Sequence, residues 1–164
     1  MKKLVCVLLF ILYPFIVFSN TTENIIITGT VNQHLNLTPQ SNTIQLTLTG
    51  DGSEAVGTDT ITAVSNIKLW KITVTSMNSS YLVHDTLQVP YKVKIDNEDA
   101  ATNSFSSFAS VPTGGGSLTF IKKTKKGGSA LLVTVKVESQ NTADELYEAG
   151  TNYMDTLVFT ISVN

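Results

Sequence analysis

Cysteine and arginine are the residues that this chain most plainly lacks. Its single cysteine, Cys6, lies inside an apolar stretch at the amino terminus, and none of the 164 residues is arginine. Without that stretch the chain has no thiol for a disulfide, a thiolate metal site or a nucleophile. Nine lysines then face thirteen carboxylates, a net charge of 9 − 13 = −4. This mildly acidic balance argues against nucleic acid and anionic membranes as partners.

The amino terminus has the features of a secretory signal peptide. Lys2 and Lys3 form a short positive region, residues 4–18 are apolar, and small residues permit cleavage after Ser19 or Asn20. We therefore expect residues 1–19 to be a removable signal and the protein to be exported. The apolar stretch is shorter than a transmembrane helix requires, so we do not expect the protein to be embedded in a membrane. The remaining length fits one domain.

Catalytic and metal-binding motifs are missing from the sequence. His34 and His84 are far apart and stand in no metal-ligand spacing. Asp96, Glu98 and Asp99 form an acidic cluster that lacks the pattern of a calcium-binding EF-hand loop. No nucleophile elbow or phosphate-binding loop occurs. We expect neither an enzyme nor a cofactor.

Alternating apolar residues dominate the rest of the chain, and this period of two predicts β-strands. Polar residues and glycines separate the runs, and Pro90 predicts an edge position or a bulge. The expected strands cover residues 24–31, 43–49, 67–75, 87–95, 118–121, 130–137 and 157–163. A long loop at 96–116, a lysine-rich hairpin tip at 122–128 and a short helix or loop at 141–147 connect the later strands. This pattern indicates an all-β sandwich.

The first and last runs are the most informative, because each places four residues on one face. These residues are Ile25, Ile27, Gly29 and Val31 in the first run, and Leu157, Phe159, Ile161 and Val163 in the last. An apolar strand at a chain end must pair, either within its own domain or with a neighbouring molecule. Periodicity alone favours pairing within its own sheet, because sequential strands usually pair. The last run would then face an ordinary closed core.

Three segments resemble the major pilins of the colonization-factor fimbriae, a class 5, alternate chaperone–usher family. Residues Asn24–Leu37 are similar to the amino terminus of those pilins, Asp85–Ile95 to a mid-chain strand that also carries a proline, and Ala149–Ser162 to the closing strand. The three segments follow the family's order and spacing, so the resemblance spans nearly the whole chain after the signal. Two positions depart from it. Gly29 stands where alanine or serine is expected, and Gln33 where the segment often ends in proline.

The resemblance implies an immunoglobulin-like β-sandwich that is incomplete and is completed by a donor strand from a neighbouring subunit. Residues 20–33 would be the donor strand and residues 34–164 the sandwich domain. Ile25, Ile27, Gly29 and Val31 would then enter an acceptor groove formed in part by Leu157, Phe159, Ile161 and Val163. A head-to-tail contact of this kind does not close on itself, so it produces a fibre.

The same resemblance implies a set of partners and a location. The partners are identical subunits in a homopolymer, a periplasmic chaperone, an outer-membrane usher and, in some fimbriae, a tip adhesin. The location is a cell-surface fimbria that is reached through the periplasm and supports cell adhesion. A second interpretation stays open, namely a monomeric secreted or periplasmic β-sandwich that binds a glycan or protein ligand. The two differ over whether the amino-terminal strand completes its own fold.

Overall fold

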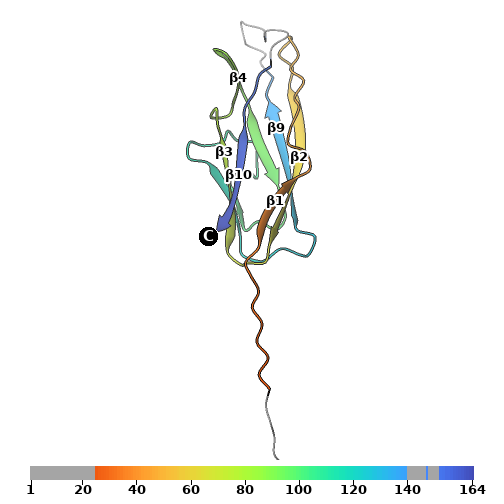
Figure 1. The fold of residues 1–164 in the computed structure, drawn as a ribbon. Coiled ribbons are helices and arrows are strands. Elements are labelled where there is room, and N and C mark those ends of the chain that lie inside the picture. Colours follow the sequence, from red (N-terminus) through yellow and green to blue (C-terminus); the bar gives the residue numbers. More distant parts are fainter. Residues whose placement is uncertain (1–24, 140–146, 148–151) are drawn as a thin grey trace, which may run out of the picture. The chain divides into compact units, whose positions relative to one another are not determined.

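A computed structural model describes residues 25–139, 147 and 152–164, and these residues contain strands and connections but no helix (Figure 1). The all-β class expected from the alternating runs is confirmed. The predicted signal lies outside the described residues, as does the predicted helix or loop at 141–147 apart from Tyr147. The strands are β1 (Leu35–Pro39), β2 (Ala55–Ser65), β3 (Trp70–Ser76), β4 (Tyr81–His84), β5 (Leu87–Pro90), β6 (Lys92–Asp96), β7 (Thr102–Asn103), β8 (Gly116–Phe120), β9 (Ser129–Val137) and β10 (Leu157–Val163).

Two four-stranded sheets make up the sandwich. Sheet A has the order β1-β2-β9-β6, sheet B has the order β10-β3-β8-β7, and every neighbouring pair is antiparallel. Alternate side chains of the central strands are buried between the sheets, as the period of two requires. Trp70 is fully buried and stacks on Phe120 with 3.8 Å between ring centroids. Its indole Nε1 donates a hydrogen bond to the carbonyl of Lys122.

Two of the predicted strands are divided or begin later in the structure. The single strand expected at 87–95 was wrong, because β5 ends at Pro90 and pairs with β4, whereas β6 begins at Lys92 and joins sheet A. Pro90 cannot donate a ladder hydrogen bond, and the chain changes sheets beside it. The strand expected from residue 67 begins at Trp70, since Leu69 has a φ of 56° and interrupts the extended backbone.

Residues 43–49 do not form the strand that their alternation predicts. Ile44, Leu46 and Leu48 are half-buried against the core, while the residues between them are exposed. No described residue forms a hydrogen bond with the main chain of residues 44–48. The segment therefore has the side-chain pattern of a strand but pairs with no strand that the structure describes. We call residues 43–49 the unpaired segment.

The two lateral sides of the sandwich differ in how they are closed. On one side Val93 of β6 exchanges two main-chain hydrogen bonds with Ala109, of 2.8 and 3.0 Å, and the amide of Ile95 donates to the carbonyl of Phe105. The other side is formed by β1 and β10, which approach one another (Figure 1). Each has a partner strand on one edge only, and among the described residues no main-chain hydrogen bond joins them. We call these the closed side and the open side.

A steric prediction concerns Gly116, the first residue of β8. A Cβ added there would overlap the ring of the fully buried Phe105. We expect Gly116→Ala to lower the free energy of unfolding by about 1–3 kcal/mol in urea denaturation, as overpacking of a dense core does. Gly127→Ala is the matched control, because its Cβ would meet open space and its stability should stay within about 0.5 kcal/mol of wild type. Equal stabilities of the two variants would contradict the prediction.

Candidate binding groove on the open side

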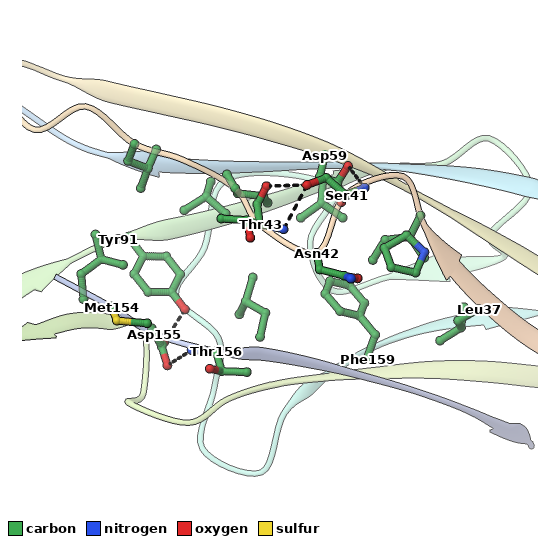
Figure 2. Close-up of a pocket in the computed structure, with 18 residues that line it drawn as sticks. Leu37, Ser41, Asn42, Thr43, Asp59, Tyr91, Met154, Asp155, Thr156 and Phe159 are labelled. Carbon is green, nitrogen blue, oxygen red and sulfur yellow. Dashed lines mark hydrogen bonds between the residues drawn. The ribbon is translucent and has the colours of Figure 1, made fainter. Parts of the chain in front are cut away.

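A groove of about 530 Å³ lies on the open side of the sandwich. One wall comes from β1 and the residues after it, the other from β10 and the residues before it, and core residues form the floor (Figure 2). Apolar side chains supply most of this lining, namely Leu37, Pro39, Ile44, Leu46, Ile61, Leu82, Val133, Val135, Met154, Leu157 and Phe159. The polar members are Ser41, Asn42, Thr43, Asp59, Tyr91, Asp155 and Thr156. Apolar side chains thus predominate in the groove, with polar side chains among them.

Within the part of the chain that the structure describes, main-chain groups on the edge of β10 that borders the groove have no ladder partners. The amide of Asn164 donates to Leu69, and the carbonyl of Thr156 accepts from Met77. These two bonds lie in the register of the β10–β3 ladder, so the even-numbered residues of β10 are its hydrogen-bonded positions. The odd-numbered residues therefore direct their N–H and C=O groups away from β3. They are Leu157, Phe159, Ile161 and Val163.

The unpaired segment forms part of the opposite wall and lies close to β2. A Cβ added to Gly57 would come within 2.7 Å of the Gln45 carbonyl oxygen and of the Ile44 side chain. Ser41, just before the segment, donates its amide to the carboxylate of Asp59 at 3.1 Å. The glycine on β2 thus allows the segment to approach sheet A closely. Both walls of the groove then present main-chain groups that form no ladder.

A carboxylate holds the beginning of β10 in place. Asp155 accepts hydrogen bonds from the hydroxyls of Tyr91 at 2.5 Å and Ser76 at 2.6 Å, and from the amide of Asn78 at 2.9 Å. Figure 2 shows Tyr91 and Asp155 meeting at one end of the groove. Burial, and then the neighbouring Asp155 carboxylate, raise the pKa of the Tyr91 hydroxyl well above its usual range. The phenol therefore stays protonated and donates to the carboxylate.

The structure distributes the four predicted acceptor residues along β10. Leu157 and Phe159 line the groove. Ile161 packs against the core beyond the lining, and Val163 is 50% exposed. All four carry main-chain groups directed to the open edge. Sequence reasoning did not assign the groove residues of the unpaired segment, although the alternation of Ile44 and Leu46 was a usable signal, and it had no signal for Tyr91 and Asp155.

The predicted donor residues are not paired within the described chain. None of the described strands includes residues 25–31. Ile25, Ile27 and Val31 are 89%, 91% and 85% exposed, and Gly29 would have open space around an added Cβ. The chain divides into units after Val31. We call residues 25–31 the arm.

The part of the chain that the structure describes contains no candidate metal site and no candidate membrane-spanning helix. Within residues 25–139, 147 and 152–164 no three histidine, cysteine, aspartate or glutamate side chains gather in a cluster able to hold a metal ion. No helix among these residues is long and apolar enough to cross a membrane. Asp96 pairs with Lys94, and Asp99 accepts a hydrogen bond from Ser129.

Comparisons with known proteins do not assign the chain to a family. No protein-family model matches the sequence, and no curated protein is significantly similar to it. Any functional proposal therefore depends on the groove and the arm themselves.

A prediction about the groove concerns the Tyr91–Asp155 hydrogen bond. Tyr91→Phe removes one donor from a carboxylate, so we expect it to lower the free energy of unfolding at pH 7 by about 1.5–3 kcal/mol. Because the pKa of Tyr91 is raised in the folded state, the proton on its hydroxyl favours folding. This stabilisation is fully present at pH values below the ordinary tyrosine pKa of about 10. Above that pH the unfolded chain ionises first, so this stabilisation is lost as pH rises toward the folded-state pKa.

Urea denaturation at several pH values from 7 upward measures both effects. The difference between wild type and Tyr91→Phe should shrink as the pH rises above about 10. Other titrating groups are common to both proteins and cancel in the difference. A difference that stays constant with pH would show that Tyr91 does not couple its proton to folding.

Proposed function

We propose that the protein is a structural subunit of a surface fimbria, polymerised by donor-strand exchange through a chaperone–usher route and supporting cell adhesion. The single observation that carries this proposal is the unpaired edge of β10 beside an apolar groove. A strand edge of this kind is a template for another strand. An added strand can form ladder hydrogen bonds with β10 and bury apolar side chains in the groove, which is strand addition to a sheet edge.

The arm has the chemistry that such an added strand needs. Ile25, Ile27, Gly29 and Val31 alternate with Ile26, Thr28 and Thr30, so one face of an extended arm is apolar. Burial of its three large aliphatic side chains would contribute roughly 5–9 kcal/mol gross, at ~1.5–3 kcal/mol each. Each ladder hydrogen bond would add about 0.5–1.5 kcal/mol net. These contributions are large enough to hold subunits together after the entropic cost of association.

Hydrogen bonds at the root of the arm favour a neighbouring subunit as the acceptor. The Asn66 side chain accepts from the amide of His34 at 2.8 Å and donates to the carbonyl of Asn32 at 2.7 Å. The Asn66 amide also donates to the His34 carbonyl. These bonds extend the β1–β2 pairing beyond Leu35. A return of the arm into its own groove would require the chain to reverse at residues 32–34, where these bonds hold it.

The presence of an arm and a groove on the same chain accounts for head-to-tail assembly and for the involvement of a chaperone and an usher. Each subunit offers one arm and one groove, and a head-to-tail contact that does not close yields a fibre. Before assembly an apolar groove with unpaired main-chain groups is an aggregation risk. A periplasmic chaperone would reduce the risk of aggregation by covering the groove. An outer-membrane usher would then release the subunits in order.

A grafting experiment tests the proposal. One variant of the chain begins at His34, and a second carries residues 20–33 re-attached through a flexible linker after Asn164. Thermal unfolding should be cooperative at a sharply higher temperature in the grafted variant, because the grafted strand can pair with β10. Within the graft, Ile27→Asp should abolish the rise and Thr28→Asp should preserve it, since the two residues lie on opposite faces.

The same measurements separate the proposal from its alternative. If the chain from His34 is already stable and monomeric and gains nothing from the graft, donor-strand exchange is wrong. A stand-alone binding domain is then the better account. Equal effects of Ile27→Asp and Thr28→Asp in the graft would likewise contradict insertion of one apolar face.

A further inference from the structure

Free positive charge is concentrated at one end of the sandwich. Exposed lysines on the turns after β2 and β8 form this cluster, namely Lys68, Lys122, Lys123, Lys125 and Lys126. None of them forms an ion pair within the described residues, and neither does Lys71 on β3, whereas Lys92, Lys94 and Lys136 are paired with carboxylates. We call these five residues the lysine end.

The lysine end lies at the root of the arm. Ser65 and Thr124 hold the two turns together, because the Ser65 amide donates to Thr124 Oγ1 at 3.1 Å and the Thr124 amide donates to the Ser65 carbonyl at 2.9 Å. The next residue, Asn66, binds Asn32 directly after the arm. Any molecule that holds the arm up to Val31 therefore lies about one residue, or ~3.8 Å of chain, from this corner.

The opposite end of the sandwich carries exposed carboxylates, namely Asp51, Glu54, Asp85 and Glu138. Glu54 and Glu138 flank the Ala55–Val137 pair of sheet A. Asp85 follows β4, whose Val83 bridges to Met154 just before β10. Lys136 and Lys92 at this end bind Glu54 and Glu138, and the carboxylates still outnumber the lysines. We call this the acidic end.

We propose that the lysine end of one subunit docks against the acidic end of the next subunit in the fibre. This inference rests on the proposed function. β10 begins with Leu157 at the acidic end and finishes with Val163 at the lysine end. An arm that runs antiparallel to β10 in the neighbouring subunit's groove leaves that groove at the acidic end. The lysine end of the subunit that carries the arm then lies against the acidic end of the neighbour, so opposite charges meet. A parallel arm would press two lysine ends together, and like charges in contact are unfavourable.

The acidic residues near the lysine end do not change this conclusion. Glu98 and Asp99 follow β6, which is the strand of sheet A farthest from β1, and so they lie on the closed side. The arm joins the sandwich through Asn32, which accepts a hydrogen bond from Asn66 beside the lysine-bearing turns.

The first test measures how salt affects assembly of the chain from Asn20. Polymer growth after dilution from denaturant is followed by light scattering between low and high sodium chloride. Attraction between opposite ends should make growth at least roughly tenfold faster at low salt than at high salt. Growth that is independent of salt, or faster at high salt, would overturn the proposal. This test needs no variant, so no substitution can disturb the fold.

Charge exchange supplies the second test. Lys122→Glu/Lys123→Glu/Lys126→Glu and Asp51→Lys/Glu54→Lys/Asp85→Lys should each slow growth at low salt by roughly tenfold. A chain that carries all six substitutions keeps the wild-type net charge and reverses the sign of both ends, so it should regain the wild-type rate. All six positions are exposed, and cooperative thermal unfolding checks the fold of each variant. Absence of recovery in the combined variant contradicts the docking of these two ends.

A third measurement separates this inference from the proposed function. A synthetic peptide of residues 24–33 is added to wild type and to each full-length variant, and the unfolding temperature of the protein is recorded. An equal rise in all variants with unchanged polymer growth would reject the docking surface and leave the groove intact. No rise even in wild type would reject the groove as a strand acceptor. Heparin retention that depends on Lys123 and Lys126 while growth does not would assign the lysine end to an anionic glycan instead.

Discussion

The pairing of main-chain hydrogen-bonding groups is the constraint on which this structure depends. Each strand must place its N–H and C=O groups opposite partners or leave them to water. On the closed side, Val93 and Ile95 bond to the chain after β7. On the open side, β10 and the unpaired segment have no ladder partners on this edge among the described residues, beside an apolar groove. The proposed addition of one further strand depends on that asymmetry.

Specific contacts determine the shape of the groove. The Asp155 carboxylate gathers donors from Tyr91, Ser76 and Asn78 and fixes the point where β10 begins. At the opposite wall, Gly57 lets the unpaired segment lie close to β2. A preorganised groove binds an added strand with less ordering cost than a flexible one. The hydrogen bonds around Asp155 and the missing side chain of Gly57 therefore both help to fix the shape of the groove.

Much of the fold could be predicted from local pattern, and the errors have physical causes. β10 has the predicted bounds, because its alternation is long and uninterrupted. The strand expected at 87–95 failed at Pro90, where one apolar run serves two sheets. The alternation of residues 43–49 predicted correctly which side chains are buried, but it did not predict whether the segment pairs. A period of two indicates which side chains face inward and cannot show whether a neighbouring strand exists.

The sequence by itself determined the all-β class, the apolar face of the arm and the four residues of β10 whose side chains share one face. Alternation depends only on backbone geometry, so it is readable without coordinates. Only the tertiary structure decided that β1 and β10 share an open side, that Tyr91 meets Asp155 there, and that lysines and carboxylates collect at opposite ends. These features join residues distant in the chain, and such contacts follow from how the sheets pack and from no local pattern.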